Sequence, residues 1–470
     1  MTDIAETRAA PASRSTAGAL ASLSLAMLVS SLGTSIANVA LPTLSAAFAA
    51  SFEAVQWVVL AYLLAITALI VGVGRLGDLV GRRLLLIAGL ALFSAASFAA
   101  ALAPSLALLI AARAVQGLGA AVMMALTIAL VGETVPRERT GSAMGLLGTM
   151  SAIGTALGPS LGGVLIGALG WRSIFLASGA LGAVALLAAW RFLRSDEGTA
   201  RGKERGSFDA LGTLLLAATL AAYALAMTMG RGHFGGLNAA LLGAAAAGAA
   251  LFVVVEARVA SPLVKLALLR GPVLAPSLVM NALVSTVMMA TLVVGPFFLS
   301  RALGLSEAAT GAVLSIGPVV SAVCGVIAGR IVDRFGTAAM VLAGLVMMVG
   351  GCAALGLLPD VFGVAGYAAA IILLTPGYQL FQAANNTAVM ADVDGDERGV
   401  VSGMLSLSRN LGLVTGTAVM GAVFAFAVGS GNIAAAAPEA VAGGMRFTFF
   451  AAAVLVAIAA LIAMAGRRSA

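Results

Sequence analysis

The sequence predicts an all-α integral membrane protein in which 14 transmembrane helices form two pseudo-symmetric six-helix bundles and an inserted helix pair. Three observations predict this fold class: an apolar composition, a series of long apolar segments and an internal repeat. Of the 470 residues, 61% are hydrophobic and 10% are charged, whereas soluble domains carry about 25% charged residues. A soluble chain this apolar has too few polar groups to cover its surface, so the lipid bilayer is the expected solvent.

The apolar segments are long enough to cross a bilayer, which takes about 20 residues per helix. Fourteen such segments begin near residues 18, 54, 84, 105, 142, 172, 209, 237, 273, 308, 337, 364, 399 and 446. Together with the longest polar stretch, they divide the chain into an N-terminal tail (1–17), an N-terminal six-helix bundle (18–193), a loop (194–208), inserted helices 7 and 8 (209–258), a C-terminal six-helix bundle (259–466) and a C-terminal tail (467–470).

The distribution of charge predicts the orientation of these helices. Most of the 26 lysine and arginine residues fall in the tails and in alternate loops, on one side of the predicted membrane. Cytoplasmic loops are rich in such residues, so both termini and the 194–208 loop are expected in the cytoplasm. The net charge of +7 therefore reflects topology and does not indicate nucleic-acid binding. Abundant Ala and Gly, and arginine in place of lysine, favour a bacterial chain of the cytoplasmic (inner) membrane.

The internal repeat relates the two predicted bundles. GRLGDLVG at 74–81 reappears as GRIVDRFG at 329–336, an offset of 255 residues. Gly154 and Gly158 reappear as Gly412 and Gly416, at an offset of 258. Symmetry of this kind is typical of transporters, whose substrate site lies near the membrane midplane between the halves. Helices 7 and 8 then stand outside the repeat as an inserted pair.

The first motif is the charged turn GRLGDLVGRR at 74–83, between the second and third predicted helices. Gly74 and Gly81 permit a tight turn and a close approach of helices. Asp78 can accept hydrogen bonds from a helix N-terminus or from an arginine, and Asp333 is its counterpart in the second copy. An ordinary charged turn is the alternative, which the doubling of the motif disfavours.

The second motif, RAVQGLG at 113–119, places an arginine inside the fourth predicted helix. An arginine in mid-membrane costs about 2.5–3.5 kcal/mol on insertion scales, so Arg113 should face the bundle interior and have a partner. Gln116 and Gly117 lie on the same helical face. Arg113 has either a functional role or a structural one, bonded to backbone carbonyls.

The third motif is GTALGPSLGG at 154–163, in the fifth predicted helix. Its glycines recur every four residues, which gives a groove where another helix can pack closely. Pro159 removes one backbone hydrogen bond and favours a kink. Generic helix packing is the alternative, but the Gly-Pro pair and the Gly-Gly pair that follows make the motif more specific.

Together these motifs resemble the major facilitator superfamily, in its 14-helix drug:proton antiporter branch of multidrug efflux type, over nearly the whole chain. The resemblance implies the major-facilitator fold and ties Arg113 and Gln116 to proton transfer. It implies a conformational latch between the halves, formed by Gly74, Asp78, Gly81, Arg82, Arg83, Asp333 and an acidic partner, Glu133. The third motif resembles the antiporter signature of the family, which indicates export and is represented here by Gly154, Gly158, Pro159, Gly162 and Gly163.

One position departs from the family pattern, because Gly33 stands where many members carry an aspartate. Buried carboxylates suit proton coupling, since desolvation raises their pKa toward the working range. The acidic residues of this chain lie near predicted helix ends or in loops. Glu53 and Glu307, near outer helix ends, are therefore the candidate carboxylates for proton coupling beside Arg113 and Gln116. A carrier that is not coupled to protons is the alternative.

Polar side chains at helical spacing predict a substrate site, because polar helix faces in lipid must point toward protein or water. The candidates are Thr34, Asn38, Tyr62, Asn281, Tyr378, Gln379, Gln382, Asn385, Asn386 and Arg409. For any one of them, hydrogen bonding between helices, worth about 0.6 kcal/mol per pair, is the alternative. Arg409 has no obvious carboxylate at its depth and is a candidate partner for a carboxylate of the substrate, and two intramembrane arginines, if unpaired, would suit an anionic or zwitterionic substrate.

The resemblance thus implies a secondary active transporter that exports drugs or other amphipathic small molecules by alternating access and proton antiport. A dedicated metabolite or anion exporter is the alternative. No catalytic constellation, metal-ligand spacing or cofactor motif is visible, so neither an enzyme nor a cofactor nor a metal site is expected. The expected partners are a small-molecule substrate, protons and the lipid bilayer, and a monomer is the usual form in the family.

Overall fold

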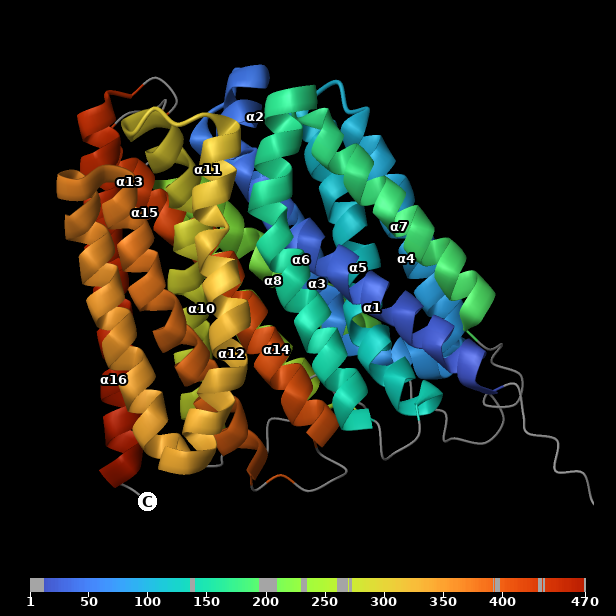
Figure 1. Ribbon diagram of the computed structural model, residues 1–470. Coiled ribbons are helices and arrows are strands. Elements are labelled where there is room, and N and C mark those ends of the chain that lie inside the picture. Colours follow the sequence, from blue (N-terminus) through green and yellow to red (C-terminus); the bar gives the residue numbers. More distant parts are fainter. Residues whose placement is uncertain are drawn as a thin grey trace, which may run out of the picture.

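The computed structural model describes residues 12–135, 140–193, 209–229, 235–259, 269, 273–391, 393, 398–429, 433 and 436–468. These residues are almost entirely helical, and 13 helices among them are long and apolar enough to cross a membrane. Figure 1 shows the long helices packed side by side in one bundle. The predicted 194–208 loop and much of both predicted tails lie outside the described residues, and the predicted domain boundaries stay a prediction.

The N-terminal half consists of α1 (Ala12–Val39), the short α2 (Leu41–Ala47), α3 (Phe52–Val80), α4 (Arg82–Ala101), α5 (Leu106–Thr134), α6 (Thr140–Leu169) and α7 (Arg172–Phe192). Ser51 caps α3, because its side chain accepts a hydrogen bond from the amide of Ala54. Glycines let the helices approach closely: a Cβ on Gly119 of α5 would lie 2.6 Å from the carbonyl oxygen of Gly89 in α4. Close backbone contacts of this kind are typical of membrane helices.

The C-terminal half consists of α10 (Leu274–Phe297), η3 (Phe298–Ala302), α11 (Glu307–Leu314), α12 (Ile316–Phe335), α13 (Thr337–Ala391), α14 (Arg398–Thr415), η4 (Gly416–Met420), α15 (Gly421–Val428) and α16 (Pro438–Arg468). Its elements η3 and η4 are π-helical turns. The first continues α10, and the second joins α14 to α15 in one long span. Wider turns of this type inside helices often mark functional positions.

Helix α13 is too long for a single crossing, because its 55 residues would reach about 80 Å as one straight helix. Its backbone leaves the helical conformation at Gly363, where φ is 54° and ψ is −127°. The two arms fold back on each other, with Gly344 packed against Gly377 and Gly351 against Leu374. They match the separate segments predicted to begin near 337 and 364, so with each arm counted as one crossing the 13 candidate spans become the predicted 14.

Both copies of the charged turn form the same backbone structure. Gly81 lies between α3 and α4 with a φ of 104°, and Gly336 lies between α12 and α13 with a φ of 83°. Each glycine amide donates a hydrogen bond to the carbonyl oxygen four residues earlier and so ends the preceding helix. Because only glycine adopts such angles at low cost, the repeat extends from the sequence to the backbone geometry.

The packing of helix pairs repeats as well. A Cβ on Gly154 of α6 would lie 3.1 Å from the Cβ of Ser31 in α1. In the C-terminal half, a Cβ on Gly412 of α14 would lie 2.6 Å from the Cβ of Ser285 in α10. The crossing of α1 with α6 is therefore equivalent to the crossing of α10 with α14, and the predicted pseudo-symmetry of the two bundles is confirmed at this crossing.

The inserted pair consists of α8 (Ala210–Thr228) and α9 (Gly236–Glu256). Helix α8 contacts both halves. The indole Nε1 of Trp57 in α3 donates to Thr228 Oγ1 at 3.1 Å, and the Tyr223 hydroxyl donates to Thr415 Oγ1 of α14 at 3.3 Å. Helix α9 packs on α8 and is otherwise mostly exposed, as expected for a helix that faces lipid.

The bundle has two distinct ends. We call the end that carries the Gly81 and Gly336 turns the basic end, and the opposite end the far end. Helix α2 and the turn between the two arms of α13 lie at the far end, whereas α16 ends at the basic end (Figure 1).

Candidate functional site

At the far end, the two halves pack directly against each other. A Cβ on Gly163 of α6 would lie 2.5 Å from the carbonyl oxygen of Glu307, at the start of α11. A Cβ on Gly311 of α11 would overlap the carbonyl oxygen of Pro159 in α6. This backbone contact between the halves therefore excludes any larger side chain at either glycine. The other glycines of the predicted antiporter motif, Gly154, Gly158 and Gly162, face α1 within the N-terminal half.

A second contact at the far end is aromatic. Phe52 of α3 packs edge-on against Phe297 of α10 and Phe424 of α15, with ring centroids 4.8 and 5.7 Å apart. One turn further along α3, the side-chain amide of Gln56 donates to the carbonyl oxygen of Thr417 in η4 at 2.9 Å. Phe52 and Gln56 are fully buried. The far end is thus closed by contacts from α3 and α6 to four C-terminal elements.

Arg113 lies buried in α5 at the centre of a hydrogen-bond network within the N-terminal half. Its guanidinium donates to the carbonyl oxygens of Val58 (2.8 Å) and Gly33 (3.1 Å) and to Gln116 Oε1 (2.6 Å). Gln116 in turn donates to Ser97 Oγ at 2.6 Å. The network joins α1, α3, α4 and α5. Arg113 therefore has partners, and backbone carbonyls are among them, as in the structural alternative stated from the sequence.

The face of the guanidinium is covered by an aromatic ring. The Arg113 Cζ atom lies 4.1 Å from the centroid of the Tyr62 ring, which gives a cation–π contact. A Cβ on Gly33 would lie 2.7 Å from the Tyr62 hydroxyl oxygen, so the missing side chain at Gly33 leaves room for this tyrosine. In place of a carboxylate at Gly33, the chain surrounds its arginine with carbonyl groups, an amide and an aromatic ring.

Two substitutions of Tyr62 should separate its two contacts. Tyr62→Phe keeps the ring and loses the hydroxyl bond to the Ser30 carbonyl oxygen (2.9 Å), so we expect a loss of about 1 kcal/mol in stability. Tyr62→Leu also removes the cation–π contact with Arg113, which should cost about 2 kcal/mol more. Thermal unfolding of the purified protein in detergent measures both changes. Equal unfolding midpoints for the two variants would show that the ring does not stabilise Arg113.

The predicted substrate residues of the N-terminal half bond mainly within their own helix. Thr34 Oγ1 donates to the Ser30 carbonyl oxygen, and the Asn38 amide donates to the carbonyl oxygens of Thr34 and Ser35. Asn38 is fully buried, and its Oδ1 has no hydrogen-bond partner. Together with Tyr62, which covers Arg113, these residues form an interior with few free polar atoms.

The predicted substrate residues of the C-terminal half gather on α10, α13 and α14. The Asn281 amide donates to the carbonyl oxygen of Leu405 at 3.0 Å, and the Asn385 amide to that of Ser277 at 3.4 Å. Buried polar atoms of these helices that lack a hydrogen-bond partner include Asn281 Oδ1, Ser285 Oγ, Gln382 Oε1, Asn385 Oδ1, Arg409 Nε and Asn410 Nδ2. Buried polar groups are normally hydrogen-bonded, so this cluster requires an explanation.

Three other predicted substrate residues lie on the second arm of α13, and the structure separates them. Gln379 donates to Ser321 of α12 and thereby holds two helices together. Tyr378 accepts from the Gln382 amide at 3.4 Å, whereas Asn386 is exposed. Helical spacing alone did not distinguish a residue that bonds a neighbouring helix from one that keeps a free polar atom.

The predicted latch at the basic end is described only in part, because the side chains of Asp78 and Glu133 lie outside the described set. Arg83 donates to the carbonyl oxygens of Leu193 (2.9 Å) and Trp190 (3.0 Å). These carbonyls lie at the C-terminal end of α7, whose partial negative charge favours a cation. A Cβ on Gly74 would meet no described atom within 4 Å, so the expected close helix approach is not found there. Asp333 is exposed.

The two carboxylates expected to couple protons differ in environment. Glu53, at the start of α3, is 7% exposed and its Oε2 lacks a hydrogen-bond partner, whereas Glu307 is exposed. Sequence analysis missed two further buried carboxyl groups, Asp209 and Glu256, which both lie beside Gly212 at the basic end of the inserted pair. The available signal was an acidic residue directly before an apolar run, since Asp209 caps α8.

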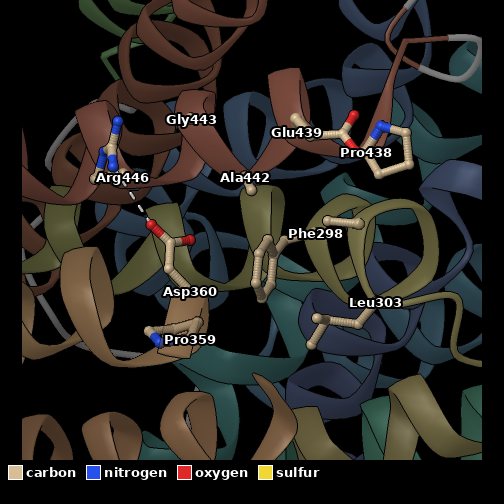
Figure 2. A pocket seen from close by; sticks show the side chains of 10 residues that line it. Phe298, Leu303, Pro359, Asp360, Pro438, Glu439, Ala442, Gly443 and Arg446 are labelled. Carbon is tan, nitrogen blue, oxygen red and sulfur yellow. Dashed lines mark ion pairs between the residues drawn. The ribbon is translucent and has the colours of Figure 1, made fainter. Parts of the chain in front are cut away.

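A cavity of about 380 Å³ opens at the far end of the C-terminal half. Figure 2 shows Phe298 of η3 beside it, and Asp360 of α13 pointing toward Arg446 of α16, with 3.5 Å between the charged atoms. This cavity contains none of the predicted substrate residues. Because Asp360 and Arg446 are both exposed, their ion pair contributes little to stability.

Two pseudo-symmetric helical bundles, packed together at one end and carrying free polar groups inside, define a multi-span membrane transporter. The sequence model of the Major Facilitator Superfamily matches residues 23–417, and the chain belongs to this family. The resemblance stated from the sequence is therefore confirmed, as is the all-helical major-facilitator fold.

The similar proteins include transporters with different named substrates. Multidrug resistance protein Stp of Mycobacterium tuberculosis is 32% identical over 397 residues, which cover 83% of this chain and 72% of Stp. Riboflavin transporter RibZ of Clostridioides difficile is 28% identical over 404 residues, which cover 85% of this chain and 86% of RibZ. A solved bacterial homologue of the human lysosomal transporter Spinster shares the fold, with a TM-score of 0.72, 16% identity and coverage of 97% and 98%.

Proposed function

We propose that this protein is a monomeric proton antiporter that exports amphipathic small molecules across a bacterial cytoplasmic membrane. The observation that carries the proposal is the closed far end, where Gly163 and Gly311 bring the two halves into backbone contact. Arginine-rich loops favour the cytoplasm, so the basic end faces inward, both termini lie in the cytoplasm and the described state is closed toward the outside. Opening this contact while the basic end closes would complete alternating access.

Glu53 is the carboxylate best placed to couple protons to this movement. It lies between Phe52 and Gln56, whose side chains contact the C-terminal half, and it is buried with one free carboxylate oxygen. Separation of the halves at the far end would bring Glu53 from a buried position to the outer solution. A carboxyl group whose exposure changes with the conformation can take up a proton on one side and release it on the other.

A metabolite exporter is the second candidate, and the similarity to a protein named as a riboflavin transporter favours it. Ethidium and riboflavin are both fluorescent, so one assay in proteoliposomes compares a cationic drug with a neutral metabolite. Molecules whose basic ends face the external solution, for which export leads into the liposome, are identified by protease accessibility of a terminal tag. Accumulation of ethidium supports a drug exporter, whereas accumulation of riboflavin alone supports the dedicated exporter.

The same proteoliposomes test the proton coupling. An imposed pH gradient should drive uphill movement of the transported dye, and Glu53→Gln should reduce this uphill movement at least tenfold while passive exchange persists. Glu307→Gln, at an exposed carboxylate on the same end, is the matched control and should behave as wild type. Transport that ignores the gradient in the wild type would remove the antiport assignment and leave an uncoupled carrier.

A further inference from the structure

We propose that the substrate site lies in the C-terminal half, at the crossing of α10 and α14, and takes an amphipathic molecule with a carboxylate or similar anionic group held by Arg409. This inference rests on the proposed transport function and names its substrate class. Two observations carry it: the buried polar atoms without partners, and the difference that they make between the equivalent crossings of the two halves.

The symmetry break is visible when the two equivalent crossings are compared. In the N-terminal half, Ser31 of α1 and Ser151 of α6 share a hydrogen bond of 2.8 Å. The same offsets that match Gly154 to Gly412 and Ser31 to Ser285 place Arg409 at the position of Ser151. There, neither Ser285 Oγ nor Arg409 Nε has a hydrogen-bond partner among the described residues. The side chains of the N-terminal crossing bond each other, whereas Ser285 Oγ and Arg409 Nε at the C-terminal crossing are left without partners.

The fully buried Arg113 occupies a position in its half that differs from the position of Arg409. The offset that matches Gly119 to Gly377 matches Arg113 to Ile371, a buried apolar residue. Arg113 is enclosed by two carbonyl oxygens and an amide oxygen, so its charge is already solvated by the protein. Arg409 has no such set of acceptors, and it is therefore the arginine available to a ligand.

The groups around the crossing define what the ligand must offer. Unpartnered donors are Arg409 Nε and Asn410 Nδ2, and unpartnered acceptors are the side-chain oxygens of Asn281, Gln382 and Asn385. The sequences of α10, α14 and the second arm of α13 contain no acidic residue, so the site carries a net positive charge. A carboxylate satisfies the donors and a hydroxyl or amine group satisfies the acceptors, because charge-assisted bonds to arginine are the strongest available here.

The test uses three dansyl compounds that differ in charge: dansylglycine (anionic), dansylamide (neutral) and dansylcadaverine (cationic). The protein is reconstituted in nanodiscs, and dansyl fluorescence is titrated against protein-free nanodiscs as reference. The wild type should bind dansylglycine at least tenfold more tightly than the other two probes. Arg409→Gln should weaken dansylglycine binding about tenfold or more and leave dansylamide binding unchanged, as expected for the loss of a charge-assisted bond.

Two further variants make the result decisive. Arg409→Lys keeps the positive charge, so it should retain more of the dansylglycine affinity than Arg409→Gln. This variant also controls for a loss of binding that is caused by misfolding. Arg446→Gln removes an exposed arginine at the far end and should bind as wild type. Weak, absent or cation-selective binding in the wild type overturns the inference, as does unchanged dansylglycine binding in Arg409→Gln. Gradient-driven export of ethidium without anion binding would refute this inference alone, whereas anion binding without transport would refute only the proposed function.

Discussion

Replacement of Arg113 by methionine is expected to abolish transport and to cause the largest loss of stability of any single substitution in the N-terminal half. The carbonyl oxygens of Gly33 and Val58 and the side-chain oxygen of Gln116 would lose their donor together. A hydrogen bond to a charged group contributes about 1.5–3 kcal/mol, so the loss of all three should reach several kcal/mol. Thermal unfolding in detergent and dye export from proteoliposomes measure the two effects.

Arg113→Lys is the informative control for this prediction. A lysine ammonium is a point charge and does not reproduce the planar fork that serves three acceptors at once, so stability should be intermediate. If the lysine variant is as stable as wild type but loses proton-driven export, Arg113 acts directly in transport. A methionine variant with an unchanged unfolding midpoint would contradict the structural role that the hydrogen bonds assign to this arginine.

Substitution of Gly163 by valine is expected to force the far end open and to stop export. Its new side chain would press against the backbone of Glu307 and Gly311, and neither backbone segment can move away as a flexible side chain does. Overpacking of this kind typically costs about 1–3 kcal/mol, which shifts the balance between two states of a carrier by about 5- to 150-fold. Gly167→Val is the matched control, because a Cβ there meets no described atom within 4 Å.

Spin labels at two exposed far-end residues, Leu169 of α6 and Val361 of α13, report the distance between the halves. Cys324 and Cys352 are free thiols and are first replaced by alanine. The Gly163→Val variant should show a longer mean distance than wild type, and Gly167→Val should not. An unchanged distance in Gly163→Val, with export intact, would exclude the α6–α11 contact as the closure of the far end.

The overall fold was accessible from the sequence because its determinants are local or periodic. Apolar segments long enough to cross the bilayer gave the spans, and the doubled charged turn gave the two halves. Gly81 and Gly336 show why the repeat was visible: both positions require a positive φ, so glycine persists in both copies. Sequence analysis also separated the two arms of α13 near Gly363, although the helix continues almost without interruption on both sides.

The interior of the candidate site was less accessible, because its contacts are to backbone groups. The acceptors of Arg113 include the backbone carbonyl oxygens of Gly33 and Val58. Every residue has such a carbonyl, so the residue types in the sequence do not show which ones accept from Arg113. Gln379 and Gln382 were both candidate substrate residues, but the first bonds another helix and the second keeps a free oxygen. The helix on which a polar side chain finds its partner depends on tertiary packing, which helical periodicity does not encode.

The hydrogen bonds of α8 have a mechanical consequence. Thr228 of this helix is hydrogen-bonded to Trp57 of one half, and Tyr223 to Thr415 of the other. The helix therefore bridges the interface between the halves. If the two halves tilt apart at that interface, a single straight helix such as α8 can move with only one of them. The inserted pair would therefore limit how far the two halves can separate. Breaking either of its hydrogen bonds, to Trp57 or to Thr415, would cost about 1 kcal/mol.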